Sequence, residues 1–364
     1  MRIVVDINHP AHVHYFKNFI WEMGKKGHEV LIIASEKDIS FKLLEDYNLE
    51  FENMGTYGTS LISKLANIPI MDIRLYRLMK TFKPDIFVGA GSIRAAHISF
   101  LLKRPCINFE DTEHSSEQIR LYLPFVAAVC TPSCFTRDLG KKQVRFNGYM
   151  ELASLHPNRF TPNPAVLAQI GLKENDPFII VRFVSWQASH DVGQHGIRDK
   201  VGLVKALEKY GRVLITSEGA LPPELQHYHI RVSPEKLHDL LYYATLYVGE
   251  GATVATEAAI LGTPSIYVSS LVGTMGNFIE LEETYDLLYS FTGSSATLRR
   301  AVEILQDPAS KEKWRIKRER LLDDKIDVTA FLIWFIENYP WSFAEIKKHP
   351  ESQYSCASVP NDAS

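Results

Sequence analysis

Residues Val248–Pro264 read VGEGATVATEAAILGTP, and this stretch decides the fold. An apolar strand ends at Val248, small residues follow, and a helical pattern begins near Thr253 and stops at Gly262. A strand joined to a helix by a glycine-rich turn is the repeating unit of doubly wound α/β sheets. The free N–H groups at the start of such a helix favour an anion. The stretch therefore predicts an α/β protein with an anion site at this turn.

Strand-length apolar runs alternate with helix-length segments on both sides of this stretch. Strands are expected at 3–7, 29–34, 86–88, 106–109 and 127–131, and again at 178–184, 213–216, 246–248 and 265–268. Parallel strands need long crossovers, which are usually helices that cover both faces of the sheet. We therefore expect two Rossmann-like, doubly wound domains that face each other across a cleft, where ligands bind at the carboxyl ends of the strands.

A proline-rich segment separates the two halves, with three prolines within residues 157–164. Proline disfavours regular structure, so this segment suits a linker. The expected parts are a first domain, a linker, a second domain, a helix that packs back on the first domain, and a disordered polar tail. Their bounds are 1–155, 156–165, 166–325, 326–344 and 345–364.

The composition is that of a globular protein, with 46% hydrophobic residues and a formal net charge of −3. A slightly negative net charge does not attract nucleic acid. The four cysteines show no zinc-ligand spacing and are expected to be reduced thiols. No apolar run approaches the roughly 20 residues that span a bilayer. The sequence predicts a soluble, cytoplasmic protein with no nucleic-acid partner and no bound metal.

Four residues of the opening stretch are candidates for binding a nucleotide. Gly251 and Ala252 allow the backbone to approach a ligand closely, and Thr253 is expected to cap the helix or donate to phosphate. Glu257 lies one turn deeper on the same helix face, where a carboxylate can accept two hydrogen bonds from a ribose diol. The alternative is an ordinary strand–helix junction with a solvated glutamate.

The stretch resembles the nucleotide-binding motif of GT-B glycosyltransferases. It resembles in particular the N-acetylglucosaminyltransferase that makes lipid II and the related UDP-N-acetylglucosamine 2-epimerases. The chain through about residue 340 is identified as a member of an uncharacterised family of predicted glycosyltransferases of this fold. The resemblance implies that the Gly251 turn holds the diphosphate of a nucleotide-sugar, UDP-linked in these relatives, and that Glu257 holds the ribose.

Three histidines follow the first strand, in the segment Asn8–His14. Histidine suits proton transfer near neutral pH, and an attacking hydroxyl must lose a proton in sugar transfer. The matching turn of the lipid II enzyme is glycine-rich and ends in His-Val, as the chain does at His12, although Pro10 and Ala11 replace the glycines. We expect His12 to be the general base, with His14 as the second candidate and His9 near the acceptor. Capping of the first helix and a metal site are the alternatives.

Two further turns of the first half follow expected strands. Ser92 is expected to cap a helix after Gly91, either beside the acceptor or in tight packing alone. Glu110 and Asp111 begin an acidic turn whose carboxyl groups can raise one another's pKa, as acid–base chemistry requires. The resemblance supports this, because the matching turn of the epimerases includes a catalytic carboxylate. The alternative is a solvated acidic loop.

Three residues follow strands at the start of the second half. Arg182 can hold a diphosphate with its two-pronged guanidinium, or it can serve in a structural ion pair. Trp186 is expected to line the sugar pocket. Ser217 is expected to meet the base or its ribose.

These features favour an inverting, metal-independent glycosyltransferase that uses a nucleotide-sugar as substrate and needs no cofactor. The helix dipole and Arg182 would stabilise the leaving diphosphate. The alternative is a nucleotide-sugar epimerase, supported by the acidic turn at Glu110. A third option is a non-enzymatic sugar-nucleotide sensor or scaffold.

The acceptor is a sugar, a lipid-linked molecule or another small molecule. Between Met54 and Lys83, apolar residues alternate with Arg74, Arg77 and lysines, as in an amphipathic helix with a basic side. Such a face can lie on an anionic membrane, and membrane-associated GT-B relatives carry a similar patch. The segment predicts peripheral contact with the inner face of the membrane, with an ordinary core-facing helix as the alternative.

Overall fold

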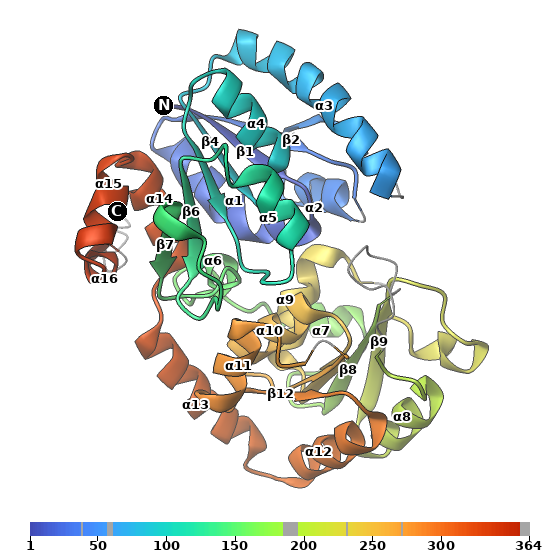
Figure 1. Ribbon diagram of the computed structural model, residues 1–364. Coiled ribbons are helices and arrows are strands. Elements are labelled where there is room, and N and C mark those ends of the chain that lie inside the picture. Colours follow the sequence, from blue (N-terminus) through green and yellow to red (C-terminus); the bar gives the residue numbers. More distant parts are fainter. Residues whose placement is uncertain (38, 57–60, 185–195, 231, 271, 357–364) are drawn as a thin grey trace. The chain divides into compact units, whose positions relative to one another are not determined.

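The computed structural model describes residues 1–37, 39–56, 61–184, 196–230, 232–270 and 272–356 (Figure 1). The chain divides into two compact units. Unit 1 consists of Met1–Arg159 and Lys325–Ser364, and unit 2 is Phe160–Asp324. The passage from unit 1 to unit 2 lies inside the range expected for the linker.

Unit 1 is built on a parallel sheet of seven strands, in the order β3-β2-β1-β4-β5-β6-β7. The strands are β1 (Arg2–Ile7), β2 (Glu29–Ala34), β3 (Phe51–Asn53), β4 (Ile86–Ala90), β5 (Cys106–Phe109), β6 (Ala128–Pro132) and β7 (Gln143–Phe146). The interior strands are nearly continuous runs of buried residues, as strands covered on both faces must be.

The helices of unit 1 form two groups by their contacts, as expected for the two faces of one sheet. One group holds α1 (Pro10–Lys25), α2 (Ser40–Asp46), α6 (Leu152–Leu155) and α14 (Val328–Glu337). The other holds α3 (Leu61–Phe82), α4 (Ile93–Leu101) and α5 (Ser116–Tyr122). The helix expected at 326–344 therefore does pack back on the first domain, through α1 and α6.

Unit 2 has a parallel sheet of five strands, in the order β12-β11-β10-β8-β9. The strands are β8 (Phe178–Phe183), β9 (Arg212–Ser217), β10 (Leu246–Gly249), β11 (Ser265–Val268) and β12 (Leu288–Phe291). The helices are α7 (Ala165–Gln169), α8 (Lys200–Leu207), α9 (Leu237–Tyr243), α10 (Ala252–Ile260), α11 (Gly276–Glu283), α12 (Ser294–Gln306) and α13 (Ser310–Asp324). The predicted α/β architecture with two parallel sheets is confirmed.

The prediction of a disordered tail from residue 345 is wrong for residues 345–356. Two short helices occupy this part of the chain, α15 (Trp341–Lys348) and α16 (Ser352–Cys356). Ile346 is buried, and the side-chain oxygen of Gln353 accepts the Asn147 N–H at 2.6 Å beside the end of β7. These helices bury too few apolar side chains to show a period in the sequence. Residues 357–364 lie outside the described part of the chain.

Candidate functional site

The glycine turn of unit 2 lies where the order of the strands reverses. In the sheet, β8 lies between β9, which follows it in sequence, and β10, which follows β9. Arg182 of β8 is paired with Gly249 of β10. The chain then turns through Gly251 into α10. Ligands of doubly wound sheets bind at such a reversal, at the carboxyl ends of the strands. Unit 2 therefore has its own candidate site at this turn.

Two glycines of the turn lie directly against other side chains. A Cβ atom on Gly249 would lie 2.2 Å from the hydroxyl oxygen of the buried Tyr247. A Cβ atom on Gly251 would lie 3.2 Å from Nε of Arg182. The turn is thus packed between a tyrosine and an arginine, and glycine leaves the backbone accessible to a ligand.

The start of α10 differs in one detail from the expected capping. The N-cap residue is Gly251, with an extended backbone and no side-chain hydrogen bond, so Thr253 is not the cap. Ala252 is the first helical residue and Thr253 lies in the first turn. The first N–H groups of a helix have no intrahelical partner and can bind an anion.

Arg182 is engaged in an ion pair. Its Nη2 lies 2.8 Å from Oε1 of Glu218, whose side chain is 45% exposed. The structural ion pair considered as the alternative role of Arg182 is therefore present. Ser217 donates its hydroxyl to the carbonyl oxygen of Gly219 at 2.9 Å. Trp186 lies outside the described residues. A bound phosphate at this turn would compete with Glu218 for the guanidinium.

Glu257 is not the solvated glutamate of the alternative interpretation. It lies on α10 with 4% of its surface exposed. Its Oε1 atom lies 3.0 Å from Nε2 of His238, a buried histidine on α9. A buried carboxylate needs such a partner, because its transfer from water is costly.

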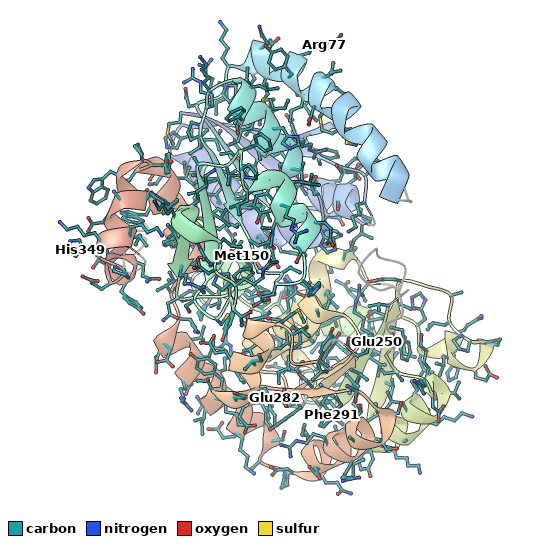
Figure 2. The ribbon with its side chains drawn as sticks, in the orientation of Figure 1. Arg77, Met150, Glu250, Glu282, Phe291 and His349 are labelled. Atoms are coloured by element: carbon teal, nitrogen blue, oxygen red, sulfur yellow. The ribbon has the colours of Figure 1, made fainter. Side chains whose placement is uncertain are left out.

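Glu250, labelled in Figure 2, ties the turn to the chain that follows β8. Its Oε2 accepts the Val184 N–H at 2.9 Å, and its Oε1 accepts the Ile197 N–H at 2.7 Å. These two N–H groups lie on either side of residues 185–195. Glu250 therefore links the backbone just after β8 to the backbone at Ile197.

The histidines of unit 1 take different positions around the start of α1. His9 is the N-cap, and its Nδ1 accepts the Ala11 N–H at 3.2 Å. Nδ1 of His12 accepts the Asn8 N–H at 3.3 Å, which leaves the ring hydrogen on Nε2. Removal from water lowers the pKa of His12 to about 4, so the ring is neutral at pH 7. In this state His12 offers a hydrogen-bond donor at Nε2.

His14 lies on another side of α1. It is buried, and its ring meets that of Tyr47 edge to face, with the ring centroids 5.8 Å apart. His12 instead stacks against Tyr15, with centroids 6.0 Å apart. The structure thus separates His14 from the surroundings of His12.

The acidic turn after β5 meets tyrosines from two helices. Glu110 accepts the Tyr122 hydroxyl at 2.8 Å and the Thr112 N–H at 3.1 Å. Asp111 accepts the Tyr15 hydroxyl at 2.9 Å. Burial, aided by the charge of Asp111, raises the pKa of Glu110 to about 8, and burial also raises the pKa of Asp111. Tyr15 therefore brings the acidic turn to the surroundings of His12.

The Gly91 turn is packed against this acidic turn. Gly91 has a positive φ of 53°, its carbonyl accepts the Gln118 amide at 2.6 Å, and its added Cβ would lie 3.4 Å from Oε2 of Glu110. Ser92 caps α4 as expected, with its hydroxyl accepting the Ala95 N–H. Ser92 is fully buried, so it supports the turn from within.

A buried ion pair lies beneath these turns. Asp6 of β1 and Arg94 of α4 are 0% and 1% exposed. Nε of Arg94 donates to both Asp6 oxygens, at 3.0 and 3.1 Å, and its Nη1 donates to Ser35 at 2.7 Å. Ser92 also donates to Asp6. The reversal between β1 and β4 in unit 1 is therefore filled by protein side chains.

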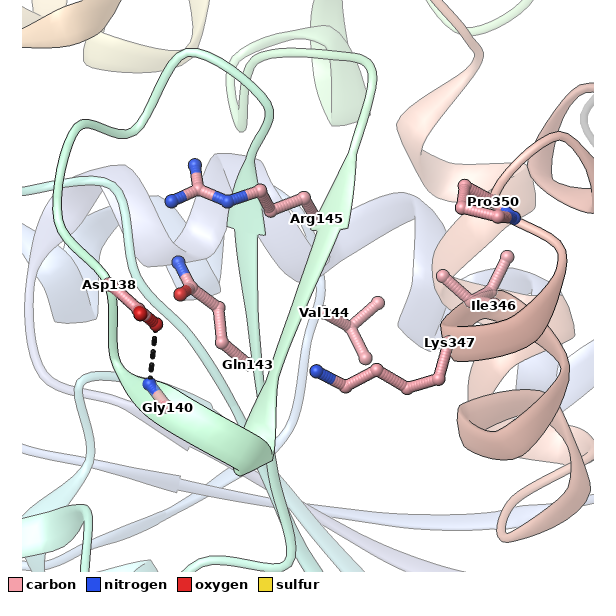
Figure 3. A pocket seen from close by; sticks show the side chains of 8 residues that line it. All are labelled: Asp138, Gly140, Gln143, Val144, Arg145, Ile346, Lys347 and Pro350. Atoms are coloured by element: carbon pink, nitrogen blue, oxygen red, sulfur yellow. Dashed lines mark hydrogen bonds between the residues drawn. The ribbon is translucent and has the colours of Figure 1, made fainter.

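A surface pocket of about 490 Å³ lies elsewhere in unit 1, against the edge strand β7 and helix α15 (Figure 3). None of the residues expected at the site lines it. Its walls are formed by Asp138, Gly140, Gln143, Val144, Arg145, Ile346, Lys347 and Pro350. In the described part of the chain, no group of three or more histidine, cysteine or acidic side chains is placed to hold a metal ion.

Sequence reasoning missed several partners of the candidate residues. His238 and Tyr15 carry no local signal, because each meets its carboxylate only through folding. Glu250 lies inside the opening stretch, but its two backbone contacts come from a distant loop. Tyr122 and Gln118 stand in an ordinary helical pattern.

Comparison with known families identifies relatives along most of the chain. The model of a family described as "Protein of unknown function (DUF354)" matches residues 1–329. An uncharacterized protein of Methanocaldococcus jannaschii is 25% identical over 324 residues, which is 84% of this chain and 94% of the relative.

Solved structures share the fold at low sequence identity. UDP-GlcNAc 2-epimerase from Methanocaldococcus jannaschii matches with a TM-score of 0.59 and 15% identity, over 88% of this chain and 99% of the other. The glycosyltransferase SsfS6 of Streptomyces sp. SF2575, complexed with thymidine diphosphate, matches with a TM-score of 0.61 and 15% identity, over 93% and 99%. The chain thus has the GT-B fold shared by glycosyltransferases and these epimerases.

Proposed function

This chain belongs to the DUF354 family, and we propose that it is a glycosyltransferase. It moves a sugar from a nucleotide-sugar to a small or lipid-linked acceptor, with inversion and without a metal. The observation that carries the proposal is the turn of unit 2, where the open start of α10 meets Arg182 at the carboxyl edge of the sheet, with Glu257 further along the same helix. SsfS6, which shares the fold, was solved with a nucleoside diphosphate.

The donor site follows from the groups at this turn. The diphosphate would bind the first N–H groups of α10 and the guanidinium of Arg182. Arg182 would then exchange its ion pair with Glu218 for one with the phosphate. Glu257 would accept hydrogen bonds from the ribose hydroxyls. The helix dipole and the arginine stabilise the charge of the leaving diphosphate, so the reaction needs no metal ion.

Unit 1 would supply the acceptor site and the groups that handle protons. Glu110, with its pKa raised to about 8, is the base that removes the proton from the attacking hydroxyl. His12, neutral and with its hydrogen on Nε2, donates a hydrogen bond to a substrate oxygen. Direct attack by the acceptor, with no enzyme nucleophile, gives inversion.

Replacing Glu257 by alanine should weaken nucleotide binding by about 1–3 kcal/mol, because charge-assisted hydrogen bonds to the ribose are lost. Calorimetric titration with UDP, GDP, dTDP and CDP measures this and also identifies the base. Glu283→Ala, at an exposed glutamate of α11, is the matched control and should bind like the wild type. A folded Glu257→Ala variant with wild-type affinity would remove Glu257 from the site.

Epimerisation of a nucleotide-sugar is the second candidate. The paired carboxyl groups of Glu110 and Asp111, both with raised pKa, favour it, because removal and return of a proton at carbon needs groups that are protonated and deprotonated near neutral pH. Incubation of UDP-N-acetylglucosamine in D₂O without acceptor separates the two reactions. Deuterium at C2 selects the epimerase, and release of UDP only when acceptor is added selects the transferase.

We further propose that α3, α4 and α5 carry a membrane contact. His97 of α4 links these helices, with Nδ1 3.1 Å from Asp72 on α3 and Nε2 3.1 Å from the Leu121 carbonyl on α5. Large apolar side chains around this link are exposed, namely Ile73, Phe100, Leu101 and Leu121, at 56%, 58%, 62% and 36%. Among the described residues, no helix combines the length and apolarity that crossing a bilayer demands.

Basic residues border this apolar patch. The exposed ones are Arg74, Arg77 (Figure 2), Lys80, Lys103, Arg104 and Arg120. Apolar contact and attraction to anionic headgroups add in binding to such a surface. The patch thus fits an anionic membrane and a lipid-linked acceptor.

Replacing Arg74 and Arg77 together by glutamine should weaken binding to anionic vesicles about 30-fold at low salt, since each basic residue near the surface contributes about 1 kcal/mol. Co-sedimentation with phosphatidylglycerol vesicles measures the effect. The control replaces two exposed lysines of unit 2, Lys209 and Lys311, and should bind like the wild type. Wild-type protein that stays in the supernatant at low salt would favour a soluble acceptor.

A further inference from the structure

Glu257 and His238 form a buried side-chain contact inside unit 2, between two neighbouring helices. Oε1 of Glu257 lies 3.0 Å from Nε2 of His238. The two residues are 4% and 3% exposed, and α9 packs directly on α10. A carboxylate can only accept, so the hydrogen of this contact is carried by Nε2 of the histidine.

The imidazole is itself held in place. The ring of Phe160 meets that of His238 edge to face, with centroids 6.2 Å apart and an angle of 87° between the planes. A ring fixed in this way sets the direction of the hydrogen bond that it donates. The bond then selects one rotamer of Glu257 and fixes the plane of its carboxylate.

We propose that His238 is a positioning residue for ribose recognition, an inference that rests on the proposed nucleotide site. The histidine occupies one lone pair of Oε1 and aligns the carboxylate. The other lone pairs, on both oxygens, are then directed to accept from the two hydroxyls of a ribose. Orienting a buried acceptor before the ligand arrives lowers the entropy lost on binding. His238 therefore contributes to the preference for a ribose over a sugar without these hydroxyls.

The test compares a ribonucleotide with its analogue that lacks both ribose hydroxyls. UDP, GDP, ADP and CDP are first screened by calorimetry against the wild type, and the tightest binder is then used with its 2′,3′-dideoxy form. His238→Phe keeps a ring of similar shape but removes the donor. We expect it to weaken the ribonucleotide about 5–20-fold, the range for loss of a buried hydrogen bond, and to leave the affinity for the dideoxy form unchanged.

Two further variants separate positioning from packing. His238→Gln retains an N–H donor and should bind the ribonucleotide within about threefold of the wild type. In a Glu257→Ala background, His238→Phe should have no further effect, because the group through which it acts is gone. Should His238→Phe fail to fold in a thermal unfolding control, His238→Asn takes its place, since its shorter amide stops short of Glu257.

The outcomes separate this inference from the proposed function. If His238→Phe weakens both nucleotides equally, or weakens the ribonucleotide as much without Glu257 as with it, the positioning role is wrong and the nucleotide site stands. If the wild type binds neither these four nucleotides nor dTDP, the proposed function and the inference fall together. Binding of dTDP alone, which lacks the 2′-hydroxyl, overturns the inference and keeps the nucleotide site. A loss confined to the ribonucleotide and dependent on Glu257 supports both.

Discussion

Replacement of Arg94 by methionine is expected to lower the free energy of unfolding by about 3–5 kcal/mol, the cost of leaving a buried charge without its partner. Arg94 donates to both oxygens of Asp6 and to Ser35, and both members of the ion pair are at most 1% exposed. Without the guanidinium, the hydrogen bonds to Asp6 from other side chains in the described part of the chain come from the neutral Ser92 hydroxyl and the Asn8 side-chain amide. Urea unfolding at pH 7 measures the loss.

The double variant Asp6→Asn/Arg94→Met tests whether the unpaired charge of Asp6 causes the loss of stability. Removal of both charges of a buried pair costs less than removal of one, so the double variant should be more stable than Arg94→Met alone. Arg77→Met, at an exposed arginine of α3, is the matched control and should change stability by less than about 0.5 kcal/mol. A cost below about 1 kcal/mol for Arg94→Met would contradict the assigned role.

Replacement of Glu110 by glutamine is expected to lower turnover by roughly 10²–10⁴-fold, the usual contribution of a general base. The readout is release of nucleoside diphosphate from the donor identified by titration. A base must be unprotonated in the free enzyme, so wild-type kcat/KM should rise with pH and level off above about 8, the pKa to which burial raises Glu110. The rise should be absent from the Glu110→Gln variant and present in His12→Ala.

The same pKa shift predicts that folding stability depends on pH, and this dependence can be measured without an activity assay. The carboxyl of Glu110 has a pKa of about 8 when folded against an ordinary 4.5, so the folded state binds its proton more tightly. The stability that this proton confers is complete below about pH 4.5 and is lost as the pH rises to about 8, by up to about 1.4 kcal/mol per pH unit. Glu110→Gln should remove this dependence.

Glu117→Gln, at an exposed glutamate of α5, is the control for both measurements and should leave both profiles unchanged. An unaltered pH profile of kcat/KM in the Glu110→Gln variant would transfer the role of base to another group. Because the lowered pKa of His12 gives an opposite slope below about pH 6.5, the diagnostic quantity is the difference between the wild type and Glu110→Gln, and equal stability profiles of the two between pH 4.5 and 8 would contradict the raised pKa itself.

The strands that sequence reasoning missed are all edge strands. β3 and β7 end the first sheet and β12 ends the second. An edge strand has one neighbour and is often short, so it lacks the long apolar run that marks a strand buried on both sides. The predicted strands carry such a run, and they include β9, the other edge strand of the second sheet, which has three consecutive buried apolar residues.

The candidate site divides in a similar way. Gly251 and Glu110 closely follow the ends of strands, and Glu257 lies on α10, the helix that begins at the Gly251 turn. The carboxyl end of a parallel strand is where a sequence alone can place a site. Their partners lie far away in the chain, such as His238 for Glu257 and Tyr15 for Asp111. Whether a carboxylate is solvated, paired or protonated depends on those partners, so the pattern along the chain cannot supply it.

The return of the chain to unit 1 at Lys325 determines the order in which the protein can be completed during synthesis. Unit 2 is one continuous segment, so it can fold as soon as it has left the ribosome. Unit 1 cannot, because α14, which contacts α1 and α6, is made after unit 2. Until α14 is made, the apolar face of α1 in Met1–Arg159 remains exposed. A nascent chain that ends before Lys325 therefore combines a complete unit 2 with an incomplete unit 1, and is the form that most exposes apolar surface to aggregation.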